Sequence, residues 1–180
     1  LAVVGLLIYI KPIRNNSKII ERMFLSFDRP EDRPNTLLWL STQIIFGYLI
    51  LMPFIIYFFS VGYANLILIP ILVNGIGDGL AEPVGIRFGR IKYKTYALFT
   101  KKKYERTVEG SACVFLSSII VIIFFNSGFT SSEFFTVIII FPIVMTLAEA
   151  FAPHTWDTPF LFLFGFFILY FVKNMPFVSH

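Results

Sequence analysis

The sequence predicts an all-α membrane protein, a polytopic bundle of transmembrane helices in one integral membrane domain over residues 1–180. Of the 180 residues, 57% are hydrophobic and 14% are charged, whereas a soluble domain carries about 25% charged residues. Phenylalanine alone occurs 23 times, more than a soluble core of this size could bury. The single cysteine, Cys113, rules out a disulfide framework. These features exclude a disordered chain, a disulfide scaffold and a soluble enzyme.

Long uncharged segments predict about six membrane spans. No Asp, Glu, Lys or Arg occurs from Pro34 to Gly77, and at 1.5 Å per residue this run covers about 66 Å, enough to cross a ~30 Å hydrocarbon core twice. Residues 1–10 are expected to be the end of an earlier helix in a chain shortened at its N-terminus. The other expected spans are 37–59, 63–83, 111–127, 134–152 and 158–173.

The basic residues predict the orientation of these spans. All but one of the 15 Lys and Arg residues fall in two blocks, 11–33 and 87–106. An even number of spans separates the blocks, so both can face the cytoplasm, as the positive-inside rule prefers. The loop 128–133 then faces the other side, and the turn 153–158 returns to the basic side. Lys173, the exception, is expected to extend from a helix end to the interface.

Charge alone leaves two interpretations of the block 87–106. It could attract anionic lipid headgroups, at roughly 1 kcal/mol for each basic residue near the surface. It could instead cradle a polyphosphate. By charge alone the lipid interpretation is favoured, and it holds most strongly for the run at 101–103.

Carboxylates at the ends of the spans are the most informative residues, because an acidic group at membrane depth is costly and indicates function. Asp78, Glu82 and Glu149 lie at span ends on the basic side, and Asp157 follows in the neighbouring turn. Asp78 and Glu82 are four residues apart and share a helix face, with Asn74 one turn earlier. Such oxygen ligands suit Mg²⁺. The alternative is a helix end neutralised by neighbouring arginines.

The same segment contains residues that affect helix geometry. Gly75 and Gly79 have the spacing of a small-residue packing face between helices. Pro83 and Gly85 predict that the helix ends just after Glu82, where exposed backbone groups would border a wet site. No Walker A motif, protein-kinase motif or dinucleotide fingerprint is present.

One ordered block resembles a known family. The segment contains Gly77-Asp78, Ala81-Glu82, Gly85 and Phe88-Gly89, then basic residues to Arg106, then Glu109-Gly110-Ser111. This order and spacing resemble the CTP-dependent lipid kinases, which include dolichol kinase, phytol kinase and the CTP-dependent diacylglycerol kinase. Ala148-Glu149-Ala150 and Asp157-Thr158-Pro159 partly match a later feature of that family. The resemblance covers roughly residues 28–172, and residues 74–112 form its nucleotide- and metal-binding block.

The resemblance implies a kinase that transfers the γ-phosphate of CTP to the hydroxyl of a membrane lipid alcohol: a polyprenol or dolichol, phytol, or diacylglycerol. The preference for CTP over ATP rests on the resemblance alone. The expected partners are CTP, the lipid alcohol and membrane lipids, and no nucleic acid. The expected location is a multi-pass membrane protein whose basic loops and active site face the cytoplasm. The alternatives are another nucleotide–lipid transferase, such as a cytidylyltransferase, and a small transporter coupled to cations or protons.

Specific residues carry the expected chemistry. Asp78, with Glu82 or Asn74, would hold Mg²⁺, and Glu149 or Glu109 would accept the proton of the hydroxyl, which makes Asp78, Glu82, Glu149 and Glu109 the catalytic candidates. The expected nucleotide-binding residues are Gly77, Gly79, Gly85, Arg87, Gly89, Lys92, Lys94, Arg106, Gly110 and Ser111. Glu109 and Ser111 could instead simply begin a helix. The segment 28–33 is expected to be a compact loop with internal ion pairs.

Overall fold

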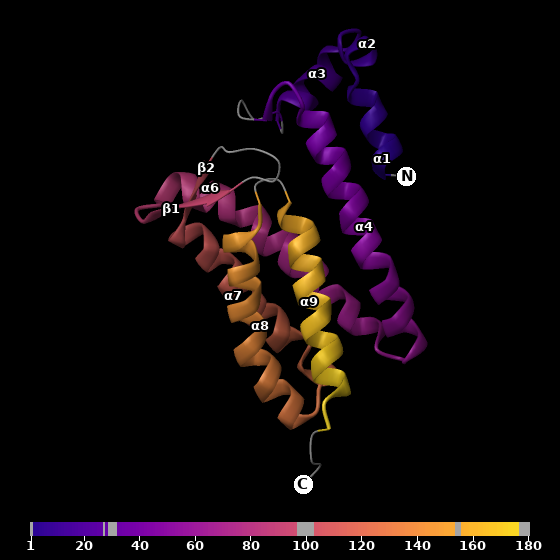
Figure 1. The fold of residues 1–180 in the computed structure, drawn as a ribbon, viewed down its shortest axis with the longest axis vertical. Coiled ribbons are helices and arrows are strands. Elements are labelled where there is room, and N and C mark those ends of the chain that lie inside the picture. The colour runs from indigo at the N-terminus through magenta and orange to yellow at the C-terminus, as the bar shows by residue number, and fades with distance from the viewer. Residues whose placement is uncertain (1, 27, 29–31, 97–102, 154–155, 177–180) are drawn as a thin grey trace.

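Helices dominate the fold, as predicted, and four of them are long and apolar enough to cross a membrane. The computed structural model describes the chain except residues 1, 27, 29–31, 97–102, 154–155 and 177–180. The four long helices span Thr36–Ser60, Ala64–Phe88, Ser131–Phe151 and Asp157–Asn174. They are α4 (Thr36–Ser60), a composite helix, α8 (Ser131–Phe151) and α9 (Asp157–Asn174). A shorter apolar helix, α7 (Val108–Phe124), completes the bundle (Figure 1).

The N-terminal segment, predicted to be the end of an earlier helix at 1–10, is helical from Ala2 to Tyr9. It forms the single turns α1 (Ala2–Gly5), η1 (Leu6–Tyr9) and α2 (Lys11–Arg14), followed by α3 (Lys18–Leu25). Ile10 is extended, with φ −64° and ψ 147°, and α2 begins directly after it at Lys11, with Pro12 in its first turn. The other five predicted spans correspond to α4, the composite helix, α7, α8 and α9, of which α7, with 17 residues, is shorter than the four helices that could cross a membrane by length and composition.

The composite helix continues where a break was predicted. It comprises η3 (Ala64–Ile67), α5 (Leu68–Leu72), the π-helical segment η4 (Val73–Asp78) and α6 (Gly79–Phe88). Pro83 and Gly85 lie inside α6, so the prediction that the helix ends after Glu82 is wrong. A wider turn just before Pro83 is the kind of local adjustment that lets a membrane helix accommodate proline.

The basic segment after α6 contains a small β-hairpin, which the all-α prediction omits. Strand β1 (Lys92–Tyr96) pairs antiparallel with β2 (Lys103–Thr107), with Lys94 opposite Glu105. Tyrosine and threonine favour extended backbone, and side chains alternate across a strand. Tyr93 and Thr95 accordingly turn inward, whereas Lys92 and Lys94 are exposed.

The described residues of both basic blocks lie at one end of the bundle (Figure 1), in the arrangement that the charge pattern predicts. Figure 1 shows α2, α3, the hairpin and the start of α9 at this end, which we call the basic end. The turn after α4 and η5 (Asn126–Gly128) lie at the other end. The apolar core lies between the two ends, where Phe54 and Phe58 of α4 contact Phe166 of α9, with ring centroids 5.2 and 6.1 Å apart.

Lys173 closes the far end of the bundle. It was predicted to extend to the interface, but its ammonium lies 2.8 Å from Glu133 Oε2 and its side chain is 6% exposed. The ammonium also lies over the rings of Tyr63 and Phe129, 4.5 and 5.4 Å from their centroids. The ion pair therefore joins the start of α8 to the end of α9.

Candidate functional site

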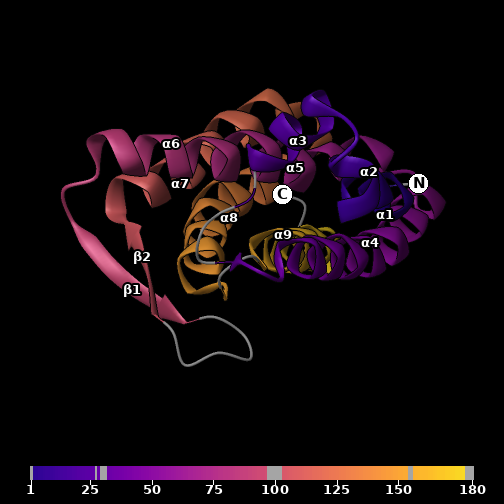
Figure 2. The same ribbon diagram turned by 90° about the horizontal axis from the view of Figure 1, so that it is seen from above.

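A cavity of about 860 Å³ lies at the basic end of the bundle, within the size range of small-molecule sites. The first turns of α4, one face of α6, strand β2 and the adjoining ends of α8 and α9 enclose it (Figures 1 and 2). Its wall combines four parts of the sequence that are far apart. The described residues that line it include Asp32, Thr36, Trp39, Leu40, Gln43, Asp78, Gly79, Glu82, Gly85, Ile86, Gly89, Lys92, Tyr104, Glu105, Arg106, Thr107, Gly110, Glu149 and Asp157.

The two carboxylates of the α6 face, Asp78 and Glu82, both line this cavity, one helical turn apart. Asn74, the third predicted metal ligand, does not, and its Oδ1 is buried without a hydrogen-bond partner among the residues that the structure describes. Asn74 belongs to the π-helical segment, whose wider turns change the angle between successive side chains. The predicted row of three oxygen ligands is therefore reduced to two at the cavity.

Close packing between α6 and β2 shapes the wall beside these carboxylates. A Cβ added at Gly85 would lie 2.6 Å from Thr107 Oγ1, and one at Gly89 would lie 2.5 Å from Thr107 Cγ2. A Cβ at Gly110 would lie 2.7 Å from the carbonyl oxygen of Ala81. These glycines thus bring the strand and the start of α7 against α6. In the described structure, these three glycines shape the cavity by allowing this close contact between the elements.

Arg106 occupies the centre of a buried ion-pair network. Its guanidinium donates to Glu149 Oε1 from α8 and to Asp157 Oδ1 from α9, and lies 3.5 Å from the carbonyl oxygen of Ala152. The side chains of Arg106 and Glu149 are only 14% and 4% exposed. Burial opposes the charge of Arg106, but the two carboxylates outweigh it and raise the pKa of Arg106 above its ordinary value.

The network continues from Glu149 to the hairpin. Ser111 Oγ donates to Glu149 Oε2 at 2.7 Å, and the Tyr93 hydroxyl lies 2.6 Å from Ser111 Oγ. Burial raises the pKa of the Tyr93 phenol, partly offset by the hydrogen bond with Ser111. Both oxygens of Glu149 are therefore engaged, and one chain of polar contacts ties β1, β2, α7, α8 and α9 together.

The cavity is acidic rather than basic. Six of its described lining residues are acidic and two, Lys92 and Arg106, are basic. Lys92 is paired with Glu105 at 3.0 Å, and the hydrogen bond from Lys92 lowers the pKa of Glu105. Lys94 lies on the exposed face of β1. Since the basic side chains are paired or directed outward, an anionic ligand in this cavity would need cations of its own.

Several predicted site residues lie outside the cavity wall. Gly77 packs against α7, where an added Cβ would lie 3.0 Å from Val114 Cα. Arg87 is exposed, with its guanidinium 5.6 Å from the centroid of the Phe88 ring. Glu109 accepts the backbone N–H of Arg90 at 2.9 Å, so its carboxylate fastens the start of the hairpin. Ser111 also lies outside the wall, and its hydroxyl donates a hydrogen bond to Glu149, which lines the cavity.

Sequence reasoning missed the contribution of α4. Thr36, Trp39, Leu40 and Gln43 line the cavity at the spacing of one helix face. Thr36 and Gln43 are polar residues within an uncharged apolar run, and this signal could have identified the face. Residues 29–31 of the predicted loop at 28–33 lie outside the described residues, and its described part contains one ion pair: Arg33 Nε donates to Asp28 Oδ2 at 2.8 Å, while Thr36 Oγ1 donates to Asp28 Oδ1 at 2.6 Å.

Within the described ranges, no three His, Cys, Asp or Glu side chains form a cluster that could hold a metal ion. A metal ion in this cavity would therefore have few ligands from the described part of the protein. Comparison of the chain with protein-family models, curated proteins and solved structures found no match. A function proposed for this chain therefore rests on the geometry of the cavity and on the resemblance of residues 74–112.

Proposed function

We propose that the chain is a kinase that transfers the γ-phosphate of CTP to the hydroxyl of a membrane lipid alcohol at the cytoplasmic interface. One observation carries the proposal. The two halves of the kinase-like block, 77–89 and 106–111, contribute Asp78, Glu82, Arg106 and Gly110 to one cavity at the basic end. That cavity adjoins apolar helices long enough to cross a membrane, so an aqueous nucleotide and a membrane alcohol could meet there.

The donor set supports Mg²⁺ as the cofactor. Asp78 and Glu82 provide carboxylate oxygens on one face of α6, and Mg²⁺ is typically bound by one or two carboxylates together with substrate phosphates. When bound, the metal would neutralise phosphate charge. The acidic lining supports this assignment, because a polyphosphate would otherwise be repelled.

The chain's own residues have distinct roles in this proposal. The alcohol oxygen attacks the γ-phosphorus, the bond to the β-phosphate oxygen breaks, CDP leaves, and the hydroxyl proton passes to a carboxylate. We assign that proton to Glu82, which lies one helical turn from Asp78 on the same wall, and Asp78 is then the carboxylate assigned to the metal. Arg106, Glu149 and Ser111 then act by fixing the wall that positions the substrates.

The decisive experiment compares two positions of label in the nucleotide. Purified protein in phosphatidylcholine vesicles with Mg²⁺ receives CTP labelled at the γ- or the α-phosphate, with phytol, a dolichol, farnesol or diacylglycerol offered separately. Label reaching a lipid from γ-labelled CTP alone supports the kinase. Label from α-labelled CTP would indicate a cytidylyltransferase instead.

ATP labelled at the γ-phosphate tests the choice of nucleotide in the same vesicles. The proposal expects transfer from CTP and little from ATP. Protein that neither transfers label nor binds CTP would favour the transporter interpretation of the same carboxylates.

A further inference from the structure

Helix α4 is the least buried of the four long apolar helices, although its first turns form a wall of the cavity. In its most apolar window 11% of the residues are buried, against 33–39% in the other three helices. It packs mainly along α9, whereas α6 packs mainly along α7 (Figure 2). The cavity thus lies between two helices, α4 and α6, whose main packing partners are α9 and α7.

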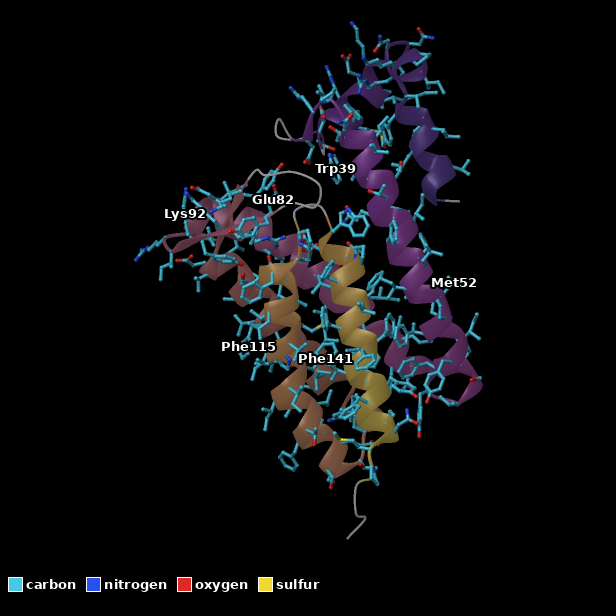
Figure 3. The ribbon with its side chains drawn as sticks, in the orientation of Figure 1. Trp39, Met52, Glu82, Lys92, Phe115 and Phe141 are labelled. Atoms are coloured by element: carbon cyan, nitrogen blue, oxygen red, sulfur yellow. The ribbon has the colours of Figure 1, made fainter. Side chains whose placement is uncertain are left out.

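The lining of the cavity includes both charged and apolar side chains. Asp78, Glu82 and Arg106 form a charged wall, whereas Trp39 and Leu40 present apolar surface from α4. Figure 3 labels Trp39 on α4 and Glu82 on α6 at the basic end. Ile86 also lines the cavity but is 79% exposed, so it stands at the rim. The cavity thus combines charged surface with the apolar side chains of Trp39 and Leu40, which lie on α4 between the polar Thr36 and Gln43, and this combination suits an amphipathic ligand.

Contacts with α9 hold α4 in place, both at the cavity and further along the helix. Gln43 Nε2 donates to Thr158 Oγ1 at 3.0 Å. Further along α4, a Cβ added at Gly47 would lie 3.5 Å from Thr158 Cγ2, so the two helices are in close contact there. The face with Trp39 and Leu40 is therefore presented by a helix anchored on α9, and its position is set before any ligand binds.

We infer that the hydrocarbon chain of the acceptor alcohol enters between α4 and α6 and lies against Trp39 and Leu40, with Ile86 at the rim. This inference rests on the proposed function for the identity of the occupant. The hydroxyl then reaches the charged wall while the chain remains in contact with the bilayer. Trp39, Leu40 and Ile86 become the residues that select the acceptor.

Binding can be tested without catalysis, because the chain has only two tryptophans. The Trp156→Phe variant leaves Trp39 as the reporter in phosphatidylcholine vesicles that contain a dibrominated long-chain alcohol, a fluorescence quencher. Quenching of Trp39 is expected to saturate as the alcohol fraction rises and to be reversed by excess unbrominated alcohol. Quenching that only rises in proportion to the bromine content would overturn the inference.

Position 38 supplies the matched control. Leu38 neighbours Trp39 on the same turn, is 61% exposed and does not line the cavity. A tryptophan placed there, in a background with Trp39→Phe and Trp156→Phe, reports contact with bulk lipid. Its quenching is expected to rise in proportion to the bromine content and to be insensitive to the competitor.

Selectivity gives a second, kinetic test. Leu40→Trp and Ile86→Trp narrow the proposed passage between α4 and α6, so each is expected to raise the KM for a long-chain alcohol about tenfold or more, within the range by which pocket size discriminates substrates. The KM for CTP should not change, and Leu38→Trp should leave both constants unaltered. Unchanged alcohol KM values in both narrowing variants would contradict the inference.

The two proposals fail separately. Saturable quenching of Trp39 without label transfer from CTP would reject the kinase while supporting the alcohol-binding passage. Label transfer together with merely proportional quenching would reject the passage while leaving the kinase in place.

Discussion

Arg106 shows how one residue's environment changes its expected role. The sequence placed it in a basic block that could bind phosphate, yet two carboxylates from different helices already bind its guanidinium. A buried arginine held in this way orders the groups around it, and removing one partner leaves another charge buried without compensation. The wall of the cavity therefore depends on this pairing.

Replacing Arg106 tests this dependence. Arg106→Gln leaves Glu149, only 3% exposed, without its counter-charge, and is expected to lower the free energy of unfolding by about 3–5 kcal/mol. Adding Glu149→Gln should restore part of the loss. Unfolding of both variants in detergent, followed by circular dichroism, measures the coupling.

Lys92→Gln, which breaks the exposed pair with Glu105, is the control and should change stability little. Equal losses in the Arg106 and Lys92 variants would contradict the account.

Tyr93 predicts a pH dependence. Its pKa is raised above the ordinary value of 10.0 by burial, so the folded state holds this proton more tightly than the unfolded state does. Stability from this group is fully present below pH 10 and is lost as the pH rises through the folded-state pKa. Tyr93→Phe lacks that loss, although it lacks the hydrogen bond to Ser111 at every pH.

Thermal unfolding of the two proteins at pH 8, 10 and 11 measures this difference. The native protein should be the more stable at pH 8, by about 0.5–1.5 kcal/mol for one hydrogen bond. Its advantage should narrow above pH 10. A constant difference across this range would show that Tyr93 titrates normally.

At the scale of elements, the π-helical segment η4 shows why the sequence could not predict how this helix packs. The spacing of Gly75 and Gly79 predicted a packing face, but they form none with the described residues of this chain, since a Cβ at either position would meet none of them within 4 Å. The close approach is at Gly77, against Ser117 and Val114 of α7. Ordinary helical spacing cannot anticipate a segment in which the turn itself is wider.

Substitutions at Gly77 and Gly75 can be compared directly for their effect on stability. Gly77→Ala forces Val114 and Ser117 of α7 to move and is expected to cost about 1–3 kcal/mol, as overpacking does. Gly75→Ala adds a methyl group in open space and should be neutral or stabilise by up to about 1 kcal/mol, since glycine is a poor helix former. Unfolding in detergent compares the two. Equal effects at both positions would contradict the packing described here.

The long elements were predictable because charge and hydropathy suffice to define them. The uncharged run from Pro34 to Gly77 and the apolar segments after Glu133 and Asp157 gave helices that match to within a few residues. The hairpin was not predicted, because a highly charged loop masks the alternation of Tyr93 and Thr95. The wall from α4 was missed for another reason: which helices meet at a cavity depends on packing between distant segments.

At the scale of the whole molecule, one end carries the described parts of the basic blocks and the cavity with Asp78 and Glu82, and the other carries the Lys173–Glu133 pair. This polarity predicts a labelling pattern. In a Cys113→Ser background, cysteines at Asn16 and Lys94 should react with an impermeant maleimide from one side of the membrane. A cysteine at Ser127 should react only from the other side. Labelling of positions 16 and 94 from opposite sides would contradict the arrangement of the helices.

The central claim is that the carboxylates of α6 serve phosphoryl transfer, and one comparison tests it most directly. Asp78→Asn keeps the size of the side chain but removes its charge, and Glu21→Gln removes an exposed carboxylate on α3, outside the cavity wall. In vesicles with Mg²⁺, γ-labelled CTP and the preferred alcohol, Asp78→Asn is expected to lower the rate of transfer by about 100-fold or more. Glu21→Gln should act at the native rate. A folded Asp78→Asn protein that transfers label as fast as the native chain would contradict the claim.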